Sequence, residues 1–263
     1  MSFIEIEYRE RTSSWGMSEL QSHDYYELYF LLEGERSFFL GDKMYNITAP
    51  AFCVIPPFAM HKTSGGKYKR INVNVTPDNL SPREADLLST LSSTVAFTLD
   101  GEWASTVINL LEKASDLSVM ESQERSRLSL SFLHTILYLI SERKLVPIDY
   151  DAKTAVAVAD TLILEIASYI NNFFYEELTL SSISEHFYIS KNSLCARFRC
   201  AMNCSVMQYL GFVRLSHAKE LLATTDKSIE EISELCGYSS ANYFSLIFKK
   251  SIGMSPINYK KTK

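Results

Sequence analysis

The stretch SIEEISELCGYSSANYFSLIFKKSIGMSP, residues 228–256, carries apolar residues at helical spacing on both sides of a single glycine. This pattern predicts two short helices that meet at a tight turn near Gly237. The second helix has small polar residues near its start and the pair Lys249 and Lys250 near its end. The rest of the sequence indicates what such a helix contacts.

A second copy of this unit lies earlier in the chain, in LSSISEHFYISKNSLCARFRCAMNCSVMQY, residues 180–209. The first helices match at an offset of 49 residues, and the second helices with the polar stretch after them match at an offset of 50. Each unit is too small to bury its own core, and its apolar positions fix two helices at a steep angle. That is the helix-turn-helix arrangement, whose second helix enters the DNA major groove. The matched pairs are Leu180 with Ile229, Ile183 with Ile232, Ser184 with Ser233, Glu185 with Glu234, Leu194 with Phe244, Phe198 with Phe248, Ser205 with Ser255 and Tyr209 with Tyr259.

The segment between the two units, VMQYLGFVRLSHAKELLATT, predicts a connecting helix over about residues 206–222. A helix of about 16 residues is roughly 24 Å long at about 1.5 Å per residue. Such a rigid connector could set two recognition helices about one DNA turn, roughly 34 Å, apart. Two helix-turn-helix units in tandem are a far more specific signal than one.

The charge of the chain is unevenly distributed. The net charge of −5 over 263 residues argues on its own against a nucleic-acid partner. Residues 178–263, however, carry 11 positive and 6 negative side chains, and the acidic excess lies in residues 1–177. This asymmetry is typical of a sensor joined to a module that binds a polyanion. Five cysteines, a charged N-terminus and no long apolar run favour a cytoplasmic chain with reduced thiols and no membrane partner.

The first 80 residues predict short β-strands that form a small barrel or sandwich. The segments RSFFL and KMYNI flank Gly41-Asp42, which is a two-residue hairpin signal, and INVNV alternates apolar and polar residues. Residues 81–145 turn helical, with Ser81 as the expected N-cap and Pro82 at the first helical position.

The segment RLSLSFLHTILYLIS, residues 127–141, predicts a helix that is apolar on two sides. Such a helix needs two partners. One is its own domain, and the other is either more of that domain or a second copy of the chain, so that the pattern leaves dimerisation open. The residues expected at a dimer interface are Leu130, Leu133, Leu137 and Ile140.

The tandem units closely resemble the AraC/XylS family of bacterial transcription regulators. The resemblance covers about residues 160–261, and its motifs are Gly237-Tyr238-Ser239, Tyr243-Phe244, Phe248-Lys249, Gly253, Ser255-Pro256 and Tyr259, with Arg214, Ala218, Leu221 and Leu222 in the connector. The N-terminal segments HDYYELYFLLEGE and VIPPFAMHKT resemble the cupin-like sensing domain of that family.

The resemblance implies an α+β chain of two domains. A cupin-like β-barrel over about residues 1–80 and helices over 81–145 form an effector-sensing and dimerisation domain. A linker follows over 146–153. The DNA-binding domain occupies 154–263, beginning with a long helix over about 154–174. Its helix-turn-helix units lie at about 178–202 and 228–251, joined by the long connector helix.

Position within the two units indicates which residues contact DNA. Asn242 could bind the edge of adenine, whereas Arg197 falls in a slot that is usually apolar in the family. Arg214, in the connector, is expected to brace the two units. The residues expected at the DNA are Lys191, Asn192, Ser193, Cys195, Ala196, Arg197, Arg199, Ser240, Ala241, Asn242, Ser245, Lys249 and Lys250. Phosphate contacts are expected from Lys191, Arg199, Lys249, Lys250, Lys260, Lys261 and Lys263.

The N-terminal domain is expected to bind a small effector through His23, Glu27, Tyr29 and His61. Metal-binding cupins use a His-x-His, Glu and His set, but Gln21 stands where the first histidine would be. A metal site, a metal-free effector pocket and ordinary buried polar residues all remain open, and we expect the metal-free pocket.

The sequence therefore predicts a ligand-responsive activator that reads promoter DNA as a homodimer and contacts RNA polymerase, with no enzymatic activity and no cofactor. Aromatic residues near the expected pocket would suit a sugar effector, and they would equally suit an aromatic or a lipid ligand. Two alternatives remain: a metal-dependent cupin enzyme with a helical appendage, and an interaction protein whose helices bind another regulator instead of DNA.

Overall fold

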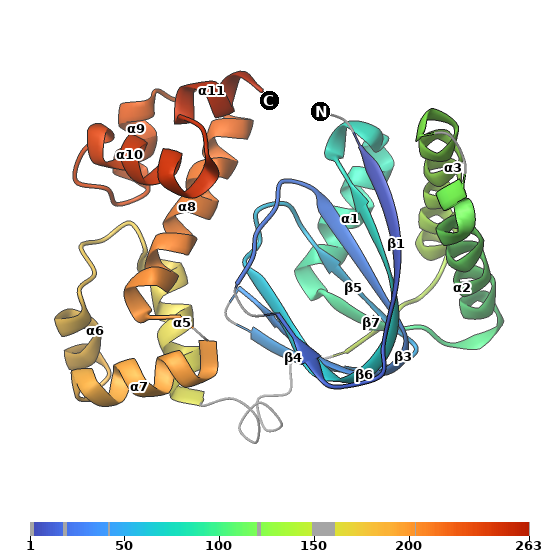
Figure 1. The fold of residues 1–263 in the computed structure, drawn as a ribbon, viewed down its shortest axis with the longest axis horizontal. Helices are drawn as coiled ribbons and strands as arrows, with labels where there is room; N and C mark the ends of the chain where they lie inside the picture. Colours follow the sequence, from blue (N-terminus) through green and yellow to red (C-terminus); the bar gives the residue numbers. More distant parts are fainter. Residues whose placement is uncertain are drawn as a thin grey trace.

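The computed structural model describes residues 3–17, 20–41, 43–119, 122–148, 161–202 and 204–262. The chain has an N-terminal β-sheet with three long helices and a C-terminal region built only of helices (Figure 1). The expected α+β class is therefore correct. No described helix combines the length and apolar character that a membrane crossing requires.

The N-terminal sheet has eight strands, and its strand order is β1-β6-β3-β5-β7-β8, with β2 paired to β6 and β4 to β3. Within the described residues no pairing joins β1 to β8, so the sheet is open and the predicted barrel is not closed. The strands are β1 Ile4–Arg11, β2 Trp15–Gly16, β3 Tyr26–Leu40, β4 Lys43–Thr48, β5 Ala51–Ile55, β6 His61–Val75, β7 Ala96–Thr98 and β8 Val146–Pro147.

Strand β3 joins two segments that the sequence presented as separate strands. The register of β3 against β6 shifts on both sides of Gly34, whose φ of 93° lies in the left-handed region. A side chain at Gly34 would collide with the carbonyl oxygen of Lys67, because a Cβ there would lie only 2.2 Å from it. Gly34 thus lets one strand bend and continue, which a residue with a side chain would prevent.

Local signals in the N-terminal region were mostly correct. Strands β3 and β4 pair antiparallel from Leu40 with Lys43, as the predicted hairpin requires, although Asp42 lies outside the described residues. Helix α1, Pro82–Thr94, begins at Ser81 with a complete capping box that includes Glu84. Val146 and Pro147, expected to open the linker, instead form β8 against β7. The rest of that linker, 149–153, lies outside the described residues.

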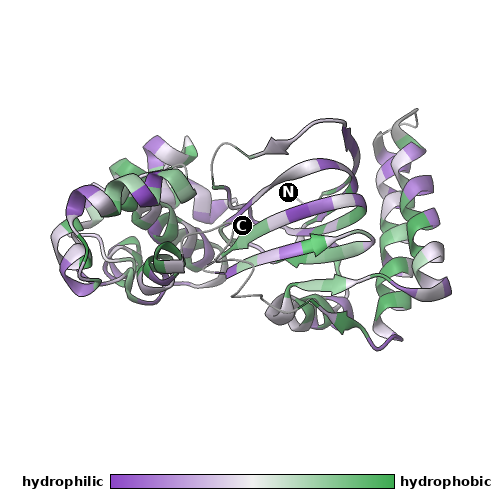
Figure 2. Cartoon of the chain, turned by 90° about the horizontal axis from the view of Figure 1, so that it is seen from below, coloured by the Kyte–Doolittle hydropathy of each residue, from purple (hydrophilic) through white to green (hydrophobic). Residues whose placement is uncertain are grey.

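Helices α2, Gly101–Ser115, and α3, Ser122–Ser141, cover one face of the sheet (Figure 2). The core between them and the sheet contains Leu133, Leu137 and Ile140, all buried. The prediction that these three form a dimer interface is wrong for this fold, because they pack inside their own domain. Leu130, the fourth predicted residue, is partly exposed. Exposed apolar side chains on α3 are instead Leu128 and Tyr138.

The C-terminal region contains seven described helices, which are α5 Thr161–Phe173, α6 Leu180–His186, α7 Lys191–Met202, α8 Val206–Thr224, α9 Ile229–Leu235, α10 Ala241–Ile252 and α11 Pro256–Lys261. The connector α8 was placed correctly and is two residues longer than predicted. The long helix expected from about residue 154 is described from Thr161 as α5, and residues before it lie outside the described part. Two cores share this region, one on each side of α8.

Candidate nucleic-acid interface and ligand pocket

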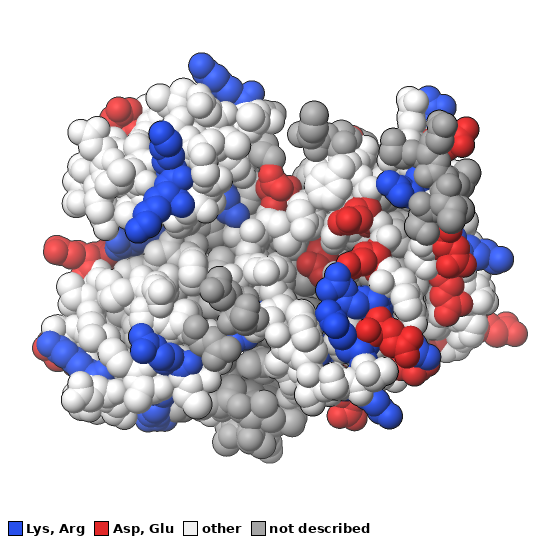
Figure 3. Space-filling model, in the orientation of Figure 1, with Lys and Arg blue, Asp and Glu red and all other residues white. Residues whose placement is uncertain are grey.

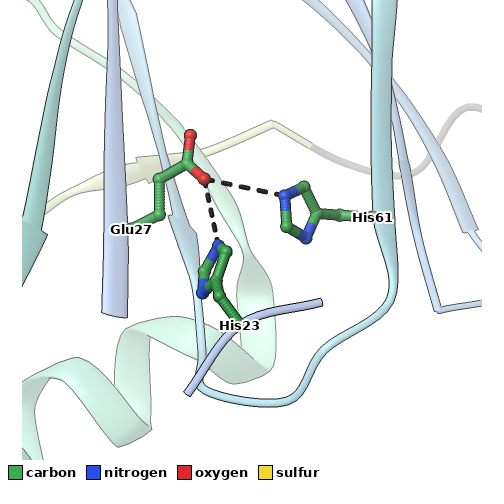
Figure 4. Close-up of side chains that lie close together, drawn as sticks. All are labelled: His23, Glu27 and His61. Atoms are coloured by element: carbon green, nitrogen blue, oxygen red, sulfur yellow. Dashed lines mark hydrogen bonds and ion pairs between the residues drawn. The ribbon is translucent and has the colours of Figure 1, made fainter. Parts of the chain in front are cut away.

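The sheet carries a polar cluster of His23, Glu27 and His61 (Figure 4). The Nε2 atom of His23 lies 3.1 Å from Oε2 of Glu27, and Nε2 of His61 lies 3.6 Å from the same oxygen. All three ligand atoms lie within 4.8 Å of one another. Three of the four predicted effector residues therefore converge on one point.

Backbone carbonyls orient both imidazole rings of this cluster. Nδ1 of His23 donates to the carbonyl oxygen of Tyr25 at 2.8 Å, and Nδ1 of His61 donates to that of Ala59 at 3.1 Å. Because a carbonyl oxygen can only accept, Nδ1 carries the proton in each ring and Nε2 faces the carboxylate of Glu27. The main chain thus fixes the orientation of both imidazole rings.

Burial and charge act on the titration of this cluster in opposite directions. Burial alone would raise the pKa of Glu27, but the hydrogen bond with His23 and the neighbouring His61 and Arg70 hold that pKa below its ordinary value. Burial lowers the pKa of His61, against the opposing effect of Glu27. Glu27 is therefore ionised at neutral pH.

A pocket of about 340 Å³ opens beside the cluster. Tyr29, the fourth predicted effector residue, also lines this pocket, and burial raises the pKa of its phenol. The phenol oxygen of Tyr29 and Oδ1 of both Asn72 and Asn74 are buried with no hydrogen-bond partner among the described residues. Buried polar atoms in this state are places where a ligand could make the missing bonds.

Sequence analysis did not identify Arg70, Asn72 and Asn74 as pocket residues. They belong to β6, where Ile71 and Val73 alternate with them and face the helices. The alternation in INVNV identified the apolar face, and the same period of two could have assigned its polar partners to the opposite face. What the sequence could not give is the pairing of β6 with β3, which brings Asn72 beside Glu27.

The helix pairs α6–α7 and α9–α10 share the same local construction. Thr179 and Ser228 cap α6 and α9, each in a complete capping box. Ser190 and Ser240 then accept from the backbone N–H three residues on, both at 3.2 Å, and so cap α7 and α10. These caps lie at the offsets of 49 and 50 residues expected from the sequence repeat.

The two cores of these helix pairs are also equivalent. Phe198 meets Tyr209 edge-on with ring centroids 5.5 Å apart, and Phe248 meets Tyr259 edge-on at 5.4 Å. The remaining apolar positions predicted to fix the helices are completely buried, as expected. They are Ile183, Leu194, Ile232 and Phe244.

The turns differ at one pair of equivalent positions, Tyr188 and Gly237. Both have positive φ, 52° for Tyr188 and 72° for Gly237. The side chain of Tyr188 is 98% exposed, so neighbouring residues leave room for it. A Cβ at Gly237 would lie 2.8 Å from the carbonyl oxygens of both Phe174 and Tyr175, so only glycine fits there.

The surfaces predicted to contact DNA are accessible. Ser193, Ala241 and Ser245 are partly exposed. The side chain of Ser240 accepts a hydrogen bond from the backbone N–H of Tyr243 as the N-cap of α10. Helices α7 and α10 lie toward opposite ends of α8 (Figure 1). The exposed members of the predicted set are Lys191, Asn192, Cys195, Ala196, Arg197, Arg199, Ser240, Asn242, Lys249 and Lys250.

Basic side chains are spread over the C-terminal region, whereas acidic ones gather on the N-terminal region (Figure 3). Lys261 is exposed, but Nζ of Lys260 donates to the carbonyl oxygen of Lys227 at 2.7 Å. Lys263 lies outside the described residues. The exposed cations of the predicted phosphate set that the structure describes lie on α7, α10 and α11.

Arg214 of α8 joins the two helix pairs, as the sequence predicted. Its Nε donates to the carbonyl oxygen of Phe174 at 2.8 Å, and Nη2 donates to that of Glu176 at 2.7 Å. Its guanidinium also lies 5.7 Å from the ring centre of Tyr238. Arg214 thus links the loop before α6 to the turn before α10.

Comparisons with known proteins agree with this geometry. Residues 183–262 match a family model described as a helix-turn-helix domain. The xylose operon regulatory protein of Haemophilus influenzae is 34% identical over 104 residues, 40% of this chain and 27% of that protein. The HTH-type transcriptional activator RhaR of Mannheimia succiniciproducens is 26% identical over 245 residues, 92% of this chain and 86% of that protein.

The chain belongs to the AraC family of transcription regulators. Among solved structures, the C-terminal domain of AraT, a response regulator from Geobacillus stearothermophilus, is 33% identical, with a TM-score of 0.39. That match covers 40% of this chain and 87% of the AraT domain. The regulator thus spans about a quarter of the length of the H. influenzae relative, and most of the M. succiniciproducens relative.

In this AraC-family regulator, the DNA-binding region packs directly on the sheet. The hydroxyl of Tyr209 donates to the carbonyl oxygen of Gly41 at 2.9 Å, and Ser216 of α8 donates to that of Phe58. Nζ of Lys219 donates to Oγ of Ser22 at 2.7 Å. No sequence signal pointed to these contacts, because each joins residues more than 150 positions apart.

Proposed function

We propose that this AraC-family regulator binds promoter DNA with α7 and α10 in two successive major grooves, and that a small molecule in the sheet pocket controls this binding. The observation that carries the proposal is the repeated construction of the two helix pairs, each with the outer face of its second helix exposed. Asn242 on α10 has the amide needed to pair with adenine.

The connector supports simultaneous contact with two grooves. Its 19 residues extend about 28 Å at about 1.5 Å per residue, close to the roughly 34 Å of one DNA turn. Arg214 stiffens the junction of the two pairs through its bonds to Phe174 and Glu176. A rigid unit loses little entropy when both helices bind, which favours tight binding.

The effector is proposed to be a small hydroxylated molecule such as a sugar, because the pocket offers Tyr29, Asn72 and Asn74 with unused hydrogen-bonding atoms. The name of the H. influenzae relative, a xylose operon regulator, supports a sugar. The effector would shift the population of DNA-competent molecules.

Activation through RNA polymerase is the proposed outcome, supported by the name of the M. succiniciproducens relative, a transcriptional activator. The proposal includes a homodimer. Its interface would be the outer face of α3, where Leu128 and Tyr138 are exposed. Tyr138→Glu should then convert the dimer to a monomer, as measured by light scattering, while Tyr188→Glu, at a more exposed tyrosine outside α3, should not.

Selection from a pool of randomised duplexes tests DNA recognition. The full chain should enrich sequences with two conserved segments separated by about one helical turn, roughly 10 base pairs. Fluorescence anisotropy on an enriched duplex should show affinity that falls steeply with salt, because phosphate contacts release counterions. The two-groove proposal would be contradicted if no sequence were enriched. It would also be contradicted if the enriched sequences shared only one short uninterrupted segment.

A further inference from the structure

We propose that His23, Glu27 and His61 bind a divalent transition-metal ion that forms the floor of the sheet pocket. The sequence alone led us to expect a pocket without metal, because Gln21 replaces a histidine. The proposal rests on the proposed function only in making this metal part of the effector pocket. Metal binding itself can be measured without DNA.

The separations of the three ligand atoms suit one metal ion. Metal bonds to imidazole nitrogen and carboxylate oxygen are about 2.1 Å, so adjacent ligand atoms lie about 3.0 Å apart in an octahedral site and about 3.4 Å apart in a tetrahedral one. The distances from Oε2 of Glu27 are 3.1 Å to His23 and 3.6 Å to His61. All three ligand atoms lie within 4.8 Å of one another, and binding to one ion requires the two imidazole rings to move closer together.

The protonation of the rings supports a cation at this point. Nδ1 of both His23 and His61 donates to a backbone carbonyl, so that a ring with no second proton directs the lone pair of Nε2 at the carboxylate of Glu27. Three electron-rich atoms that face one another repel unless a positive charge lies among them. Backbone bonds to the remote nitrogen are also how proteins orient histidine ligands to metals.

The carboxylate of Glu27 is oriented in the same way. Its Oε1 atom accepts from the side-chain amide of Asn72 and lies 4.0 Å from Arg70, which leaves Oε2 to face the two histidines. Arg70 is held in turn by Glu7 at 3.2 Å. Each of the three proposed metal ligands thus has a hydrogen-bond partner that orients it toward the other two.

A shared proton accounts for only part of this geometry. A proton on Nε2 of His23 would explain its 3.1 Å separation from Glu27. It would leave His61, whose Nε2 lies 3.6 Å from the same oxygen, beyond hydrogen-bond distance although its ring is buried and aimed there. A metal ion uses all three groups.

The ligand set indicates which metals fit. Two imidazoles and one carboxylate suit Fe²⁺, Mn²⁺, Co²⁺, Ni²⁺ or Zn²⁺, and the three-ligand arrangement leaves coordination positions open. Glu27 and His61 line the same pocket as Tyr29 and Asn72. An effector with a hydroxyl or carboxylate oxygen would therefore bind the metal and these side chains together.

Metal binding by the full chain, freed of metal by chelation, tests the proposal. Titration with Co²⁺ should give visible absorption that saturates at one equivalent, and Mn²⁺ should raise the melting temperature by about 5 °C at a hundredfold excess over Kd. Glu27→Gln and His61→Gln should abolish both responses. The near-isosteric Glu27→Gln keeps the fold testable, and circular dichroism checks it.

His134→Gln is the matched control. His134 pairs with Glu84 at 2.6 Å, and the described residues supply this pair with no third ligand, so this variant should keep the full metal response. Equal responses in Glu27→Gln and the wild type would place the ion elsewhere, for example at the exposed thiols of Cys195 and Cys200, and would overturn the proposal. So would the absence of any response to these metals. If either of these two results were found while the chain still bound DNA sequence-specifically, only the metal proposal would have failed.

Discussion

Nζ of Lys219 in α8 donates a hydrogen bond of 2.7 Å to the hydroxyl of Ser22, the residue before His23. Ser216, one turn earlier on α8, bonds to the carbonyl of Phe58, and the N–H of Phe58 in turn bonds to the carbonyl of His23 at 2.6 Å. The helix that connects the two helix pairs therefore contacts the loop that carries His23 and the loop around Phe58, which precedes His61. A ligand that moves these loops would act directly on α8.

Replacing Lys219 should weaken this junction. Lys219 is buried, and its ammonium makes bonds of 2.7 and 3.2 Å to Ser22, so Lys219→Met should lower the free energy of unfolding by about 1.5–3 kcal/mol. Hydrogen exchange at residues 22–25 should also become faster. Chemical denaturation and exchange mass spectrometry measure both effects.

The exposed Lys250→Met is the control for that change, because it removes the same charge from the surface of α10. It should leave both quantities unchanged within about 0.5 kcal/mol. Equal exchange at residues 22–25 in the two variants would show that the Lys219 bond does not hold the loop.

Gly237→Ala should destabilise the chain much more than Gly253→Ala. Both glycines have positive φ, which costs another residue roughly 1–2 kcal/mol. A Cβ at Gly253 would meet nothing within 4 Å, whereas one at Gly237 would press on Phe174 and Tyr175. We expect a loss of about 1 kcal/mol for Gly253→Ala and more than about 3 kcal/mol for Gly237→Ala, from urea unfolding. Equal losses would show that backbone conformation alone selects Gly237.

The sequence predicted the C-terminal region well because its information is local and repeated. The caps Ser190 and Ser240 and the buried Phe198 and Phe248 all follow from helical spacing over a few residues. The repeat supplied a second reading of every position. It could not show that Tyr188 shares the backbone conformation of Gly237, because tyrosine rarely adopts positive φ.

The N-terminal region was harder to predict because its sheet depends on distant pairings. The short β7 and β8 have no sequence signal of their own. Gly34 reads in the sequence as a break between two strands, although β3 continues through it. The pattern of α3 showed two apolar sides, but spacing could not tell that Leu133 and Leu137 would both be used inside the domain. The sequence offered His23, Glu27 and His61 as effector-binding candidates, yet only the fold shows that His23 and His61 lie close together.

The capping box of α1 should make stability depend on acid pH. Although partial burial alone would raise the pKa of Glu84, its hydrogen bonds with Ser81 and His134 hold that pKa below its ordinary value. A carboxyl with a depressed pKa in the folded state stabilises the fold above its unfolded pKa, about 4.5, and loses this contribution as the pH falls through the folded pKa. Unfolding free energies measured from pH 6 to 3 should therefore drop less steeply for Glu84→Gln than for the wild type. Asp86→Asn, on the same helix but outside the box, should follow the wild type.

Asn242 and Lys249 should differ in what their loss does to DNA binding. Asn242→Ala should cost about 1–3 kcal/mol on the selected duplex and relax preference at a single base pair, because a bidentate contact to adenine reads one base. Lys249→Ala should weaken binding to every duplex alike and reduce the slope of log affinity against log salt by about 0.9, because one phosphate contact is lost. Anisotropy titrations on single-base variants at several salt concentrations measure both. Lys144→Ala, exposed on the N-terminal region, should change neither quantity. An equal loss on all base variants for Asn242→Ala would assign Asn242 to the phosphate backbone instead.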